Sequence, residues 1–369
     1  MTDRVKLVRK KMKELGVDSF ITATPANADP NQAGTHGWAN VNWLTGYTGT
    51  NGIAVVAKRS AYFITDFRYT EQAKKQTKDS GFSLRIAERD LYGELAEIKS
   101  SAFGKKVGIE SENITVSIRK KLRKYLKNKK LVETEGAFSE LRAVKDRSEV
   151  YHLRQATKIT DESLQEVLQL VKPGIRELDL AVELEYRFRS KGGFIAFDTI
   201  VASGWRGALP HGKASTKKIR KGEMITFDIG ASYKGYCADL TRTVVLGKAN
   251  KKQKEVYNTV LQAQLAAIDA IKPGAHGKEV DRIARDYIDD AGYGEYFGHG
   301  LGHGIGLIVH DTPVLSPKSD WTLKEGMVTT VEPGIYIPNW GGIRIEDDVV
   351  VTSKGCSILN KSPKELIEL

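Results

Sequence analysis

Two rhythms of apolar and polar positions divide the chain into two regions. Over residues 1–140, short apolar and β-branched runs alternate with amphipathic stretches, which is the pattern of a small α/β domain. Apolar residues at helical spacing over positions 5–15 predict an opening helix. Strands are predicted at 19–23, 52–57, 61–65 and 106–110, and helices at about 68–78, 91–100 and 117–127. The stretch 25–40, rich in Pro, Asn, Gly and Ala, is typical of a loop.

From residue 141 onward the pattern changes and then repeats. One long helix is predicted from about 150 to 171 and a second from 177 to 190, and the same pair returns between 253 and 290. Lys-Pro-Gly ends the first helix of each pair, and the two copies lie 100 positions apart. A hairpin pattern follows each pair. Residues 141–369 are therefore predicted to form one domain of two similar helix-helix-hairpin halves, which puts the chain in the α+β class.

The two predicted hairpins carry four acidic residues in matching places. Asp228 and Glu332 each stand six residues after a glycine, and Asp239 and Glu346 each stand four residues after one. Two equivalent hairpins brought together would gather these carboxylates in one interior spot. Uncompensated anions cannot share a buried site, because repulsion and desolvation would drive their protonation. The duplication therefore predicts bound cations.

A glycine-rich segment adds histidine to the four acids. His299, His303 and His310 fall within twelve residues, and glycines on both sides of His303 let its backbone approach another segment closely. His211 has a matching place in the first half. The candidate metal ligands are Asp228, Asp239, His303, Glu332 and Glu346. Their oxygen-rich composition suits two divalent ions that share bridging carboxylates, and it favours Mn²⁺, with Co²⁺ or Fe²⁺ as alternatives.

Composition and charge argue against a membrane protein, a secreted protein and a nucleic-acid-binding protein, and they indicate no further catalytic residues. The 369 residues are 40% hydrophobic and 28% charged, and they contain neither a membrane-length apolar run nor an apolar signal core. Two cysteines offer no disulfide framework and suit a reducing, cytoplasmic location. The net charge of +11 is densest at residues 117–130, where eight of fourteen residues are basic. An apolar helical stripe beneath them favours a solvated helix face over a polyanion site, so neither nucleic acid nor membrane is expected as a partner.

Six short motifs follow one another in the order found in a known enzyme family. They are Ala202–Gly212, Phe227–Gly230, Ala238–Arg242, Gly302–Gly306, Val331–Tyr336 and Gly342–Asp347. Together they resemble the pita-bread metallopeptidases, and the proline-directed branch of aminopeptidase P and prolidase is the most similar. Residues 1–140 resemble the N-terminal domain of creatinase and aminopeptidase P, which leaves 141–369 as the pita-bread domain. Creatinase itself works without the metal set, whereas all five ligand positions here hold the expected residue type.

The resemblance implies how the ligands are shared. Asp228 would bind one ion, His303 and Glu332 the other, and Asp239 and Glu346 would bridge the two. The expected reaction is hydrolysis of an N-terminal Xaa-Pro bond in proline-containing peptides by a hydroxide held between the ions. The resemblance also implies a homodimer.

The remaining site residues are assigned supporting roles. Glu332 would relay a proton to the leaving nitrogen, and His310 would donate to the developing oxyanion. His211 and His299 are further candidates for holding substrate or relaying protons. Arg344, two residues before Glu346, would orient that carboxylate, and Phe197 matches an apolar residue of the family's substrate pocket.

The sequence leaves the substrate length open. A dipeptidase must recognise the free carboxylate of its substrate, usually with arginine, and prolidase-like enzymes often carry that residue after the His310 strand. Residues 311–326 contain no arginine, only Lys318 and Lys324, which slightly favours an Xaa-Pro aminopeptidase. Arg206 or a partner subunit could supply the clamp of an Xaa-Pro dipeptidase. Methionine aminopeptidase normally lacks so large an N-terminal domain, and a non-catalytic pita-bread module would have lost metal ligands.

Overall fold

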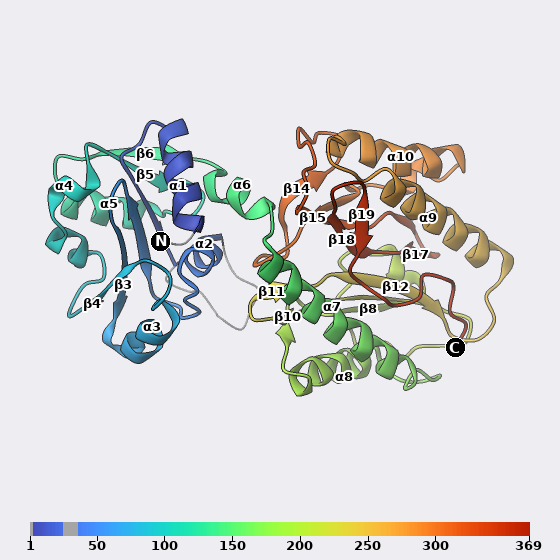
Figure 1. Cartoon of the computed structure of the whole chain (residues 1–369). Coiled ribbons are helices and arrows are strands. Elements are labelled where there is room, and N and C mark those ends of the chain that lie inside the picture. Colours follow the sequence, from blue (N-terminus) through green and yellow to red (C-terminus); the bar gives the residue numbers. More distant parts are fainter. Residues whose placement is uncertain (1–2, 25–35) are drawn as a thin grey trace. The chain divides into compact units, whose positions relative to one another are not determined.

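The computed structural model describes residues 3–24 and 36–369 (Figure 1). The described chain divides into two compact units, one reaching to Arg142 and the other running from Ala143 to Leu369. Among the helices described, none has the length and apolar character needed to span a bilayer.

The helices and strands alternate through both units. The first unit contains α1 (Asp3–Glu14), β1 (Ser19–Ala23), α2 (His36–Thr45), β2 (Ile53–Ala57), β3 (Ala61–Asp66), α3 (Thr70–Gln76), β4 (Ser83–Ala87), α4 (Ser100–Phe103), β5 (Lys106–Glu110), α5 (Val116–Tyr125), β6 (Lys130–Thr134) and α6 (Ala137–Ala143). The second contains α7 (Arg147–Leu168), α8 (Glu177–Ser190), β7 (Phe194–Ile195), β8 (Ile200–Ser203), β9 (Met224–Ile229), β10 (Ala231–Tyr233), β11 (Tyr236–Cys237), β12 (Leu240–Val245), α9 (Lys251–Asp269), α10 (Gly277–Asp290), β13 (Gly302–Gly304), β14 (Asp311–Leu315), β15 (Val328–Val331), β16 (Gly334–Ile337), β17 (Gly341–Arg344), β18 (Asp347–Val351) and β19 (Cys356–Ile358).

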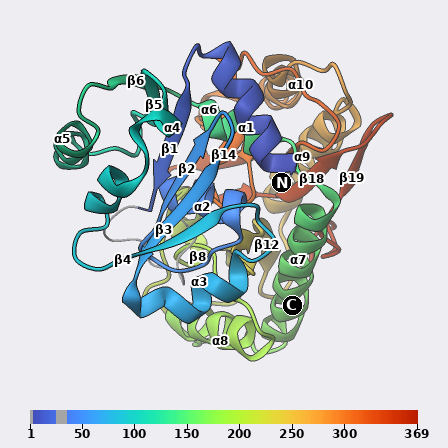
Figure 2. The same cartoon turned by 60° about the vertical axis from the view of Figure 1, so that its left-hand side comes forward.

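The first unit is built on one six-stranded sheet, whose strands β1–β4 lie side by side in Figure 2. The strand order is β4-β3-β2-β1-β5-β6, and the β1–β2 and β2–β3 pairs are antiparallel while the others are parallel. Ile21, Ile53 and Val107 of the sheet pack with Phe103 and Leu122 of the helices in one apolar core. The four predicted strands form as expected, because their alternate apolar residues have this core to face.

The sequence prediction is wrong at four places in the first unit. It misses β4 and β6, because both lie at the edges of the sheet, where half-exposed strands lack a clear apolar alternation. Residues 91–100 are predicted as a helix and instead form only a short 3-10 helix over Gly93–Glu97. The loop prediction for 25–40 is wrong from His36 onward, where α2 buries Trp38 and Trp43, so tertiary burial outweighs weak helix propensity. Residues 25–35 of that prediction lie outside the described residues.

The basic stretch at 117–130 begins as α5. Leu122 is buried beneath it, Arg119 pairs with Glu133, and the Lys121 ammonium lies over the ring of Tyr92 at 5.5 Å from its centroid. These contacts within the unit agree with a solvated helix face.

Two similar halves make up the second unit, as the duplication predicts. One apolar core, which includes Leu184 and Phe227, joins α7 and α8 to the strands β8, β9 and β12. A second core, which includes Val260 and Val349, joins α9 and α10 to β15 and β18. Figure 1 shows α9 and α10 side by side above these strands, and α7 and α8 below them. The expected α+β class and the helix-helix-hairpin repeat are confirmed.

The two halves also agree in backbone detail. A capping box starts the first helix of each half, α7 and α9. After each of these helices, Gly174 and Gly274 adopt φ values of 90° and 88°, which favour glycine because a Cβ would clash with the backbone. Their N–H groups donate to the carbonyls of Ile219 and Leu323 at 2.8 and 2.9 Å. The Lys-Pro-Gly string therefore ties each helix end to the segment that leads into its hairpin.

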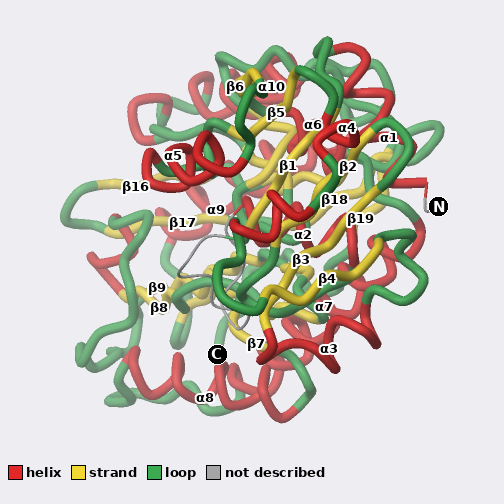
Figure 3. Tube along the Cα trace, turned by 90° about the vertical axis from the view of Figure 1, so that its left-hand side faces the viewer, coloured by secondary structure: helices red, strands yellow, loops and turns green. Residues whose placement is uncertain are grey.

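The hairpins place the four acids at neighbouring strand ends. Asp228 lies in β9 opposite Thr241 of β12, and Asp239 directly precedes β12. Glu332 directly follows β15, and Glu346 directly precedes β18. β15 and β18 are antiparallel partners. Figure 3 shows the strands β16 and β17 on the same side of the molecule as β8 and β9. β16 and β17 pair in a two-stranded sheet, and β17 contacts β9. The first and second hairpins thus meet where their acids lie.

Candidate metal centre

One cavity of about 900 Å³ in the second unit brings the predicted site residues together. Its lining includes all ten of them: Phe197, His211, Asp228, Asp239, His299, His303, His310, Glu332, Arg344 and Glu346. They come from both halves of the duplicated fold, and positions up to 149 residues apart in the chain share one hollow.

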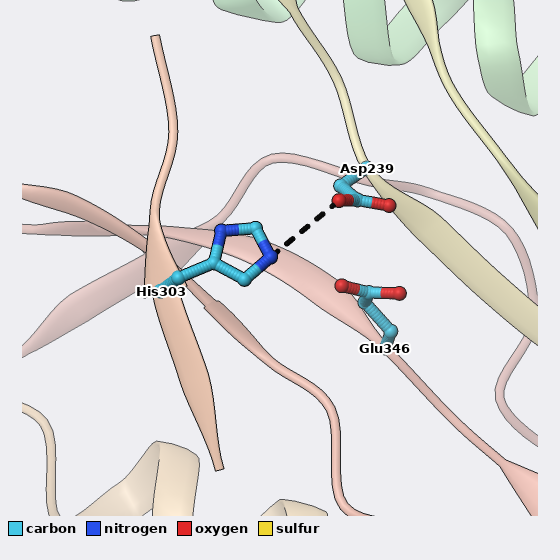
Figure 4. A group of neighbouring side chains, drawn as sticks. All are labelled: Asp239, His303 and Glu346. Atoms are coloured by element: carbon cyan, nitrogen blue, oxygen red, sulfur yellow. Dashed lines mark ion pairs between the residues drawn. The ribbon is translucent and has the colours of Figure 1, made fainter. Parts of the chain in front are cut away.

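Asp239, His303 and Glu346 form the tightest group in this cavity (Figure 4). One ligand atom from each of these residues lies within 4.8 Å of the others. The three side chains point toward one another, and His303 Nε2 stands 3.7 Å from Asp239 Oδ2 and 3.3 Å from Glu332 Oε1. A group of carboxylates and one imidazole at this spacing can coordinate a divalent cation.

Close backbone packing fixes His303. A Cβ at Gly302 would lie 2.1 Å from the carbonyl oxygen of Thr330, and one at Gly304 would lie 2.0 Å from that of Thr312. The flanking glycines thus do what the sequence suggests, since they let β13 approach its neighbours. His303 Nδ1 lies 3.1 Å from the Gly304 carbonyl, which can only accept, so Nδ1 carries the proton and Nε2 is left to ligate.

Arg344 links the acids of the two hairpins. It is predicted to orient Glu346, yet its Nη2 donates to Asp228 Oδ2 at 2.5 Å. Its hydrogen-bonded path to Glu346 runs through Thr241, whose hydroxyl accepts from Arg344 Nε at 3.0 Å and donates to Glu346 Oε2 at 2.6 Å. Because β17 contacts β9, Arg344 is hydrogen-bonded to the first hairpin as well as to the path that leads to Glu346. Burial of Arg344, only 4% exposed, makes it a fixed positive charge within the cluster.

The electrostatics of the acids fit bound cations. Burial, reinforced by repulsion from Glu346 and Asp228, raises the pKa of Asp239 well above its usual range. Burial and the charges of Glu332 and Asp228 likewise raise the pKa of Glu346 well above normal. Glu346 Oε1 is buried and has no hydrogen-bond partner among the described residues. A cation would satisfy that oxygen and remove the repulsion, so the residues present fit a divalent metal.

The neighbouring histidines are held in their neutral form. Burial lowers the pKa of His299, His303 and His310. His299 Nδ1 lies 2.8 Å from the Gly300 carbonyl and therefore donates, and its Nε2 lies 3.0 Å from the hydroxyl of Tyr336. The rings of His303 and His310 meet edge-on at 4.5 Å between centroids. A neutral His310 keeps one N–H to donate and does not add positive charge to the cavity.

Three residues of the site escape the sequence prediction. Tyr336 accepts from Arg344 Nη1 at 2.7 Å, and Thr330 donates to Glu332 Oε1 at 3.1 Å while accepting the His303 N–H at 3.0 Å. Thr241 positions Glu346 as described. Strand parity could have found the threonines, because each lies two residues from a ligand and so shares its face. Tyr336 gives no such signal in the sequence. Its hydroxyl reaches Arg344 because β16 pairs with β17.

The buried Arg242 fixes the backbone next to the candidate ligand Glu346. Arg242 Nη1 donates to the backbone carbonyl of Glu346 at 2.6 Å, and its Nη2 donates to Asp347 Oδ1 at 2.8 Å. Its other bonds reach the carbonyls of Thr241 at 2.9 Å and of Ser362 and Pro363, both at 2.8 Å. The segment after residue 358 is thereby tied to the ligand hairpin, and it continues beside β12 through backbone hydrogen bonds.

Both units of the chain match known protein families. The sequence profile of metallopeptidase family M24 matches residues 151–353, and that of the creatinase/prolidase N-terminal domain matches 4–144. The Xaa-Pro dipeptidase of Pyrococcus furiosus is 36% identical over 370 residues, which cover 100% of both chains.

Solved structures give the same match over the full length. An Xaa-Pro dipeptidase from Bacillus anthracis has a TM-score of 0.92 and 42% identity, and the match covers 100% of this chain and 99% of that one. An X-Pro aminopeptidase from Thermotoga maritima has a TM-score of 0.89 and 38% identity, and the match covers 98% and 100%. The resemblance drawn from the six motifs is confirmed.

Gly302→Ala is expected to lower the free energy of unfolding by about 2 kcal/mol or more and to weaken metal binding, because its Cβ would push β13 and His303 off Thr330. Gly298→Ala is the matched control from the same segment, since a Cβ there meets nothing within 4 Å. Thermal unfolding and metal titration measure both effects. Equal stability of the two variants would contradict the close approach.

Glu346→Gln is expected to stabilise the metal-free protein, and more so as pH rises from about 5 to 8. A carboxyl whose pKa is raised in the folded state costs stability above its unfolded value of about 4, and the amide removes that cost. Metal-loaded protein should show the reverse, since a ligand is lost. Melting temperatures with chelator and with Mn²⁺ test this, and Glu325→Gln, at an exposed acid, is the control. A stabilisation that shrinks as pH rises would contradict the proposed repulsion.

Proposed function

The chain belongs to metallopeptidase family M24, and from this premise we propose that it is an Xaa-Pro dipeptidase that uses two divalent metal ions. Peptide hydrolysis follows from the family, whereas the restriction to dipeptides is our inference. It is supported by full-length relatives named Xaa-Pro dipeptidase at 36% and 42% identity. These relatives support the dipeptidase alternative better than the aminopeptidase preference drawn from residues 311–326.

One observation carries the metal-dependent part of the proposal. Three buried carboxylates, the partly buried Glu332 and an imidazole line a single cavity, with a ligand oxygen of Glu346 left unpartnered among the described residues. We propose Asp228 as ligand of one ion, His303 and Glu332 as ligands of the other, and Asp239 and Glu346 as bridges. The oxygen-rich set favours Mn²⁺, with Co²⁺ or Fe²⁺ as alternatives.

The chain's own side chains then have separate tasks in hydrolysis. When bound, the two cations neutralise the carboxylates, polarise the scissile carbonyl and activate a water molecule. Glu332, whose pKa is raised by burial, accepts a proton from the attacking water and passes it to the proline nitrogen as the C–N bond breaks. His310 donates an N–H toward the carbonyl oxygen as negative charge develops there. Phe197 and His211 border the space left for substrate.

Proline suits a site of this kind. The nitrogen of an Xaa-Pro bond carries no hydrogen, so a peptidase that anchors its substrate by that N–H loses a contact. A cavity that grips the substrate's terminal groups and carbonyl does not depend on it.

An Xaa-Pro aminopeptidase is the second candidate. The observation in its favour is that Arg344 is the one arginine lining the cavity within the described ranges, and each of its three nitrogens already donates one hydrogen bond. The cavity therefore lacks the arginine that usually binds a dipeptide carboxylate.

Hydrolysis of Leu-Pro and Leu-Pro-Gly in Mn²⁺ distinguishes the two candidates. We expect release of leucine from Leu-Pro, at least about tenfold faster in kcat/KM than from Leu-Pro-Gly, since the longer peptide places its carboxylate elsewhere. A chelator should abolish both activities, and Leu-Gly serves as the control for proline. Equal or faster cleavage of Leu-Pro-Gly would establish the aminopeptidase instead.

Metal stoichiometry tests the ligand assignment. Asp239→Ala and Glu346→Ala should each lose both ions, because a bridging ligand serves two sites, whereas His303→Ala should retain one ion. Mn²⁺ content after equilibrium dialysis measures this, and His276→Ala, at an exposed histidine, should keep two. Equal loss of both ions in all three ligand variants would refute the division of ligands.

A further inference from the structure

A dipeptidase needs a cation for the substrate's carboxylate, and the usual arginine is missing from the segment 311–326. The question rests on the proposed function. Arg344 lines the cavity but is buried, and it already donates to Asp228, Thr241 and Tyr336. Moving it to a substrate would strip Asp228 of its partner. Arg344 is therefore not available as the clamp.

Arg206, the clamp suggested by the sequence, has another task. Its Nη1 pairs with Glu177, a fully buried carboxylate, and its Nη2 donates to the carbonyl of Lys213 at 2.8 Å. Arg206 is absent from the lining of the metal-centre cavity. Its bonds instead fix the backbone of the loop that carries His211 and Lys213, so the suggestion is corrected.

Lys213 is the lysine of that loop, and it lines the cavity. Its backbone is held at both ends, because the carbonyl accepts from Arg206 and the N–H donates to the His211 carbonyl at 2.9 Å. Its ammonium pairs with Asp198, and the two side chains are 71% and 72% exposed. An ion pair this exposed contributes little stability, so it can be exchanged for another carboxylate at low cost.

An apolar wall lies beside this ion pair, as the ring of a C-terminal proline requires. Asp198 directly follows Phe197, which together with Ile200 gives the cavity an apolar wall. Lys213 lies two residues after His211 on the same lining. The same stretch of the lining therefore offers an apolar face to a proline ring and, through Lys213, a cation to its carboxylate.

We propose that Lys213 binds the C-terminal carboxylate of the dipeptide, and that Asp198 holds the ammonium in place until substrate replaces it. Lysine suits this exchange, because it is a point charge on a flexible stem rather than a rigid fork. The assignment makes Lys213 a specificity-determining residue: it selects peptides that end at proline.

The proposal is tested by measuring the kinetics of Lys213 variants on a substrate with a C-terminal carboxylate and on one without. Lys213→Met should raise KM for Leu-Pro about tenfold with little change in kcat, and should leave kcat/KM for Leu-Pro amide unchanged, since the amide has no charge to lose. Lys213→Arg should restore Leu-Pro cleavage. Asp198→Asn should lower KM for Leu-Pro about threefold by removing the competing carboxylate. Lys318→Met, an exposed lysine outside the lining, controls for the loss of a surface charge.

Two outcomes would overturn the assignment. Equal losses for Leu-Pro and Leu-Pro amide in Lys213→Met would show that the residue does not act on the carboxylate, and no loss for either would show that it does not bind substrate. Failure of the proposed function is a separate result: wild-type enzyme would then leave Leu-Pro intact while cleaving Leu-Pro-Gly.

Discussion

Repulsion among buried carboxylates is the constraint around which the second unit is organised. The two hairpins bring Asp228, Asp239, Glu332 and Glu346 to one cavity, and burial raises the pKa of three of them. The chain offsets part of this cost itself, through the buried guanidinium of Arg344 and the hydroxyls of Thr241 and Thr330. The repulsion that remains fits bound divalent cations, so the fold that gathers the acids also creates the need for metal.

Duplication supplies the acids, but departures from the duplication give the cavity its chemistry. A purely symmetric pair of halves would present two identical ligand sets. His303, from the glycine-rich segment of the second half alone, and Arg344, which crosses to the first hairpin, make the two sides unequal. The loop of His211 and Lys213 lies only in the first half. Both halves thus contribute proposed metal ligands, and both contribute residues proposed to contact substrate.

Periodicity and spacing predict the parts of this protein that are locally encoded. The long helices α7 to α10 and the two hairpins follow from apolar repeats and from glycines with fixed roles, such as Gly174 and Gly274. Four of the five candidate ligands could be selected because acids at matching positions of a repeat need a common explanation, and His303 because glycines flank it on both sides. The edge strands β4 and β6, the helix α2 and the partner of Arg344 could not, because each depends on contacts with residues distant in sequence.

The hydrogen bonds of Arg242 join residues that are synthesised at different times. All candidate ligands precede residue 347, whereas the carbonyls of Ser362 and Pro363 that hold Arg242 come later in the chain. A nascent chain that has just exposed Glu346 to solvent carries every ligand but lacks the segment that fixes the arginine behind it. Because synthesis runs from the N-terminus, the acids emerge before their frame is complete. The proposed metal centre therefore has its full frame only in the completely folded second unit.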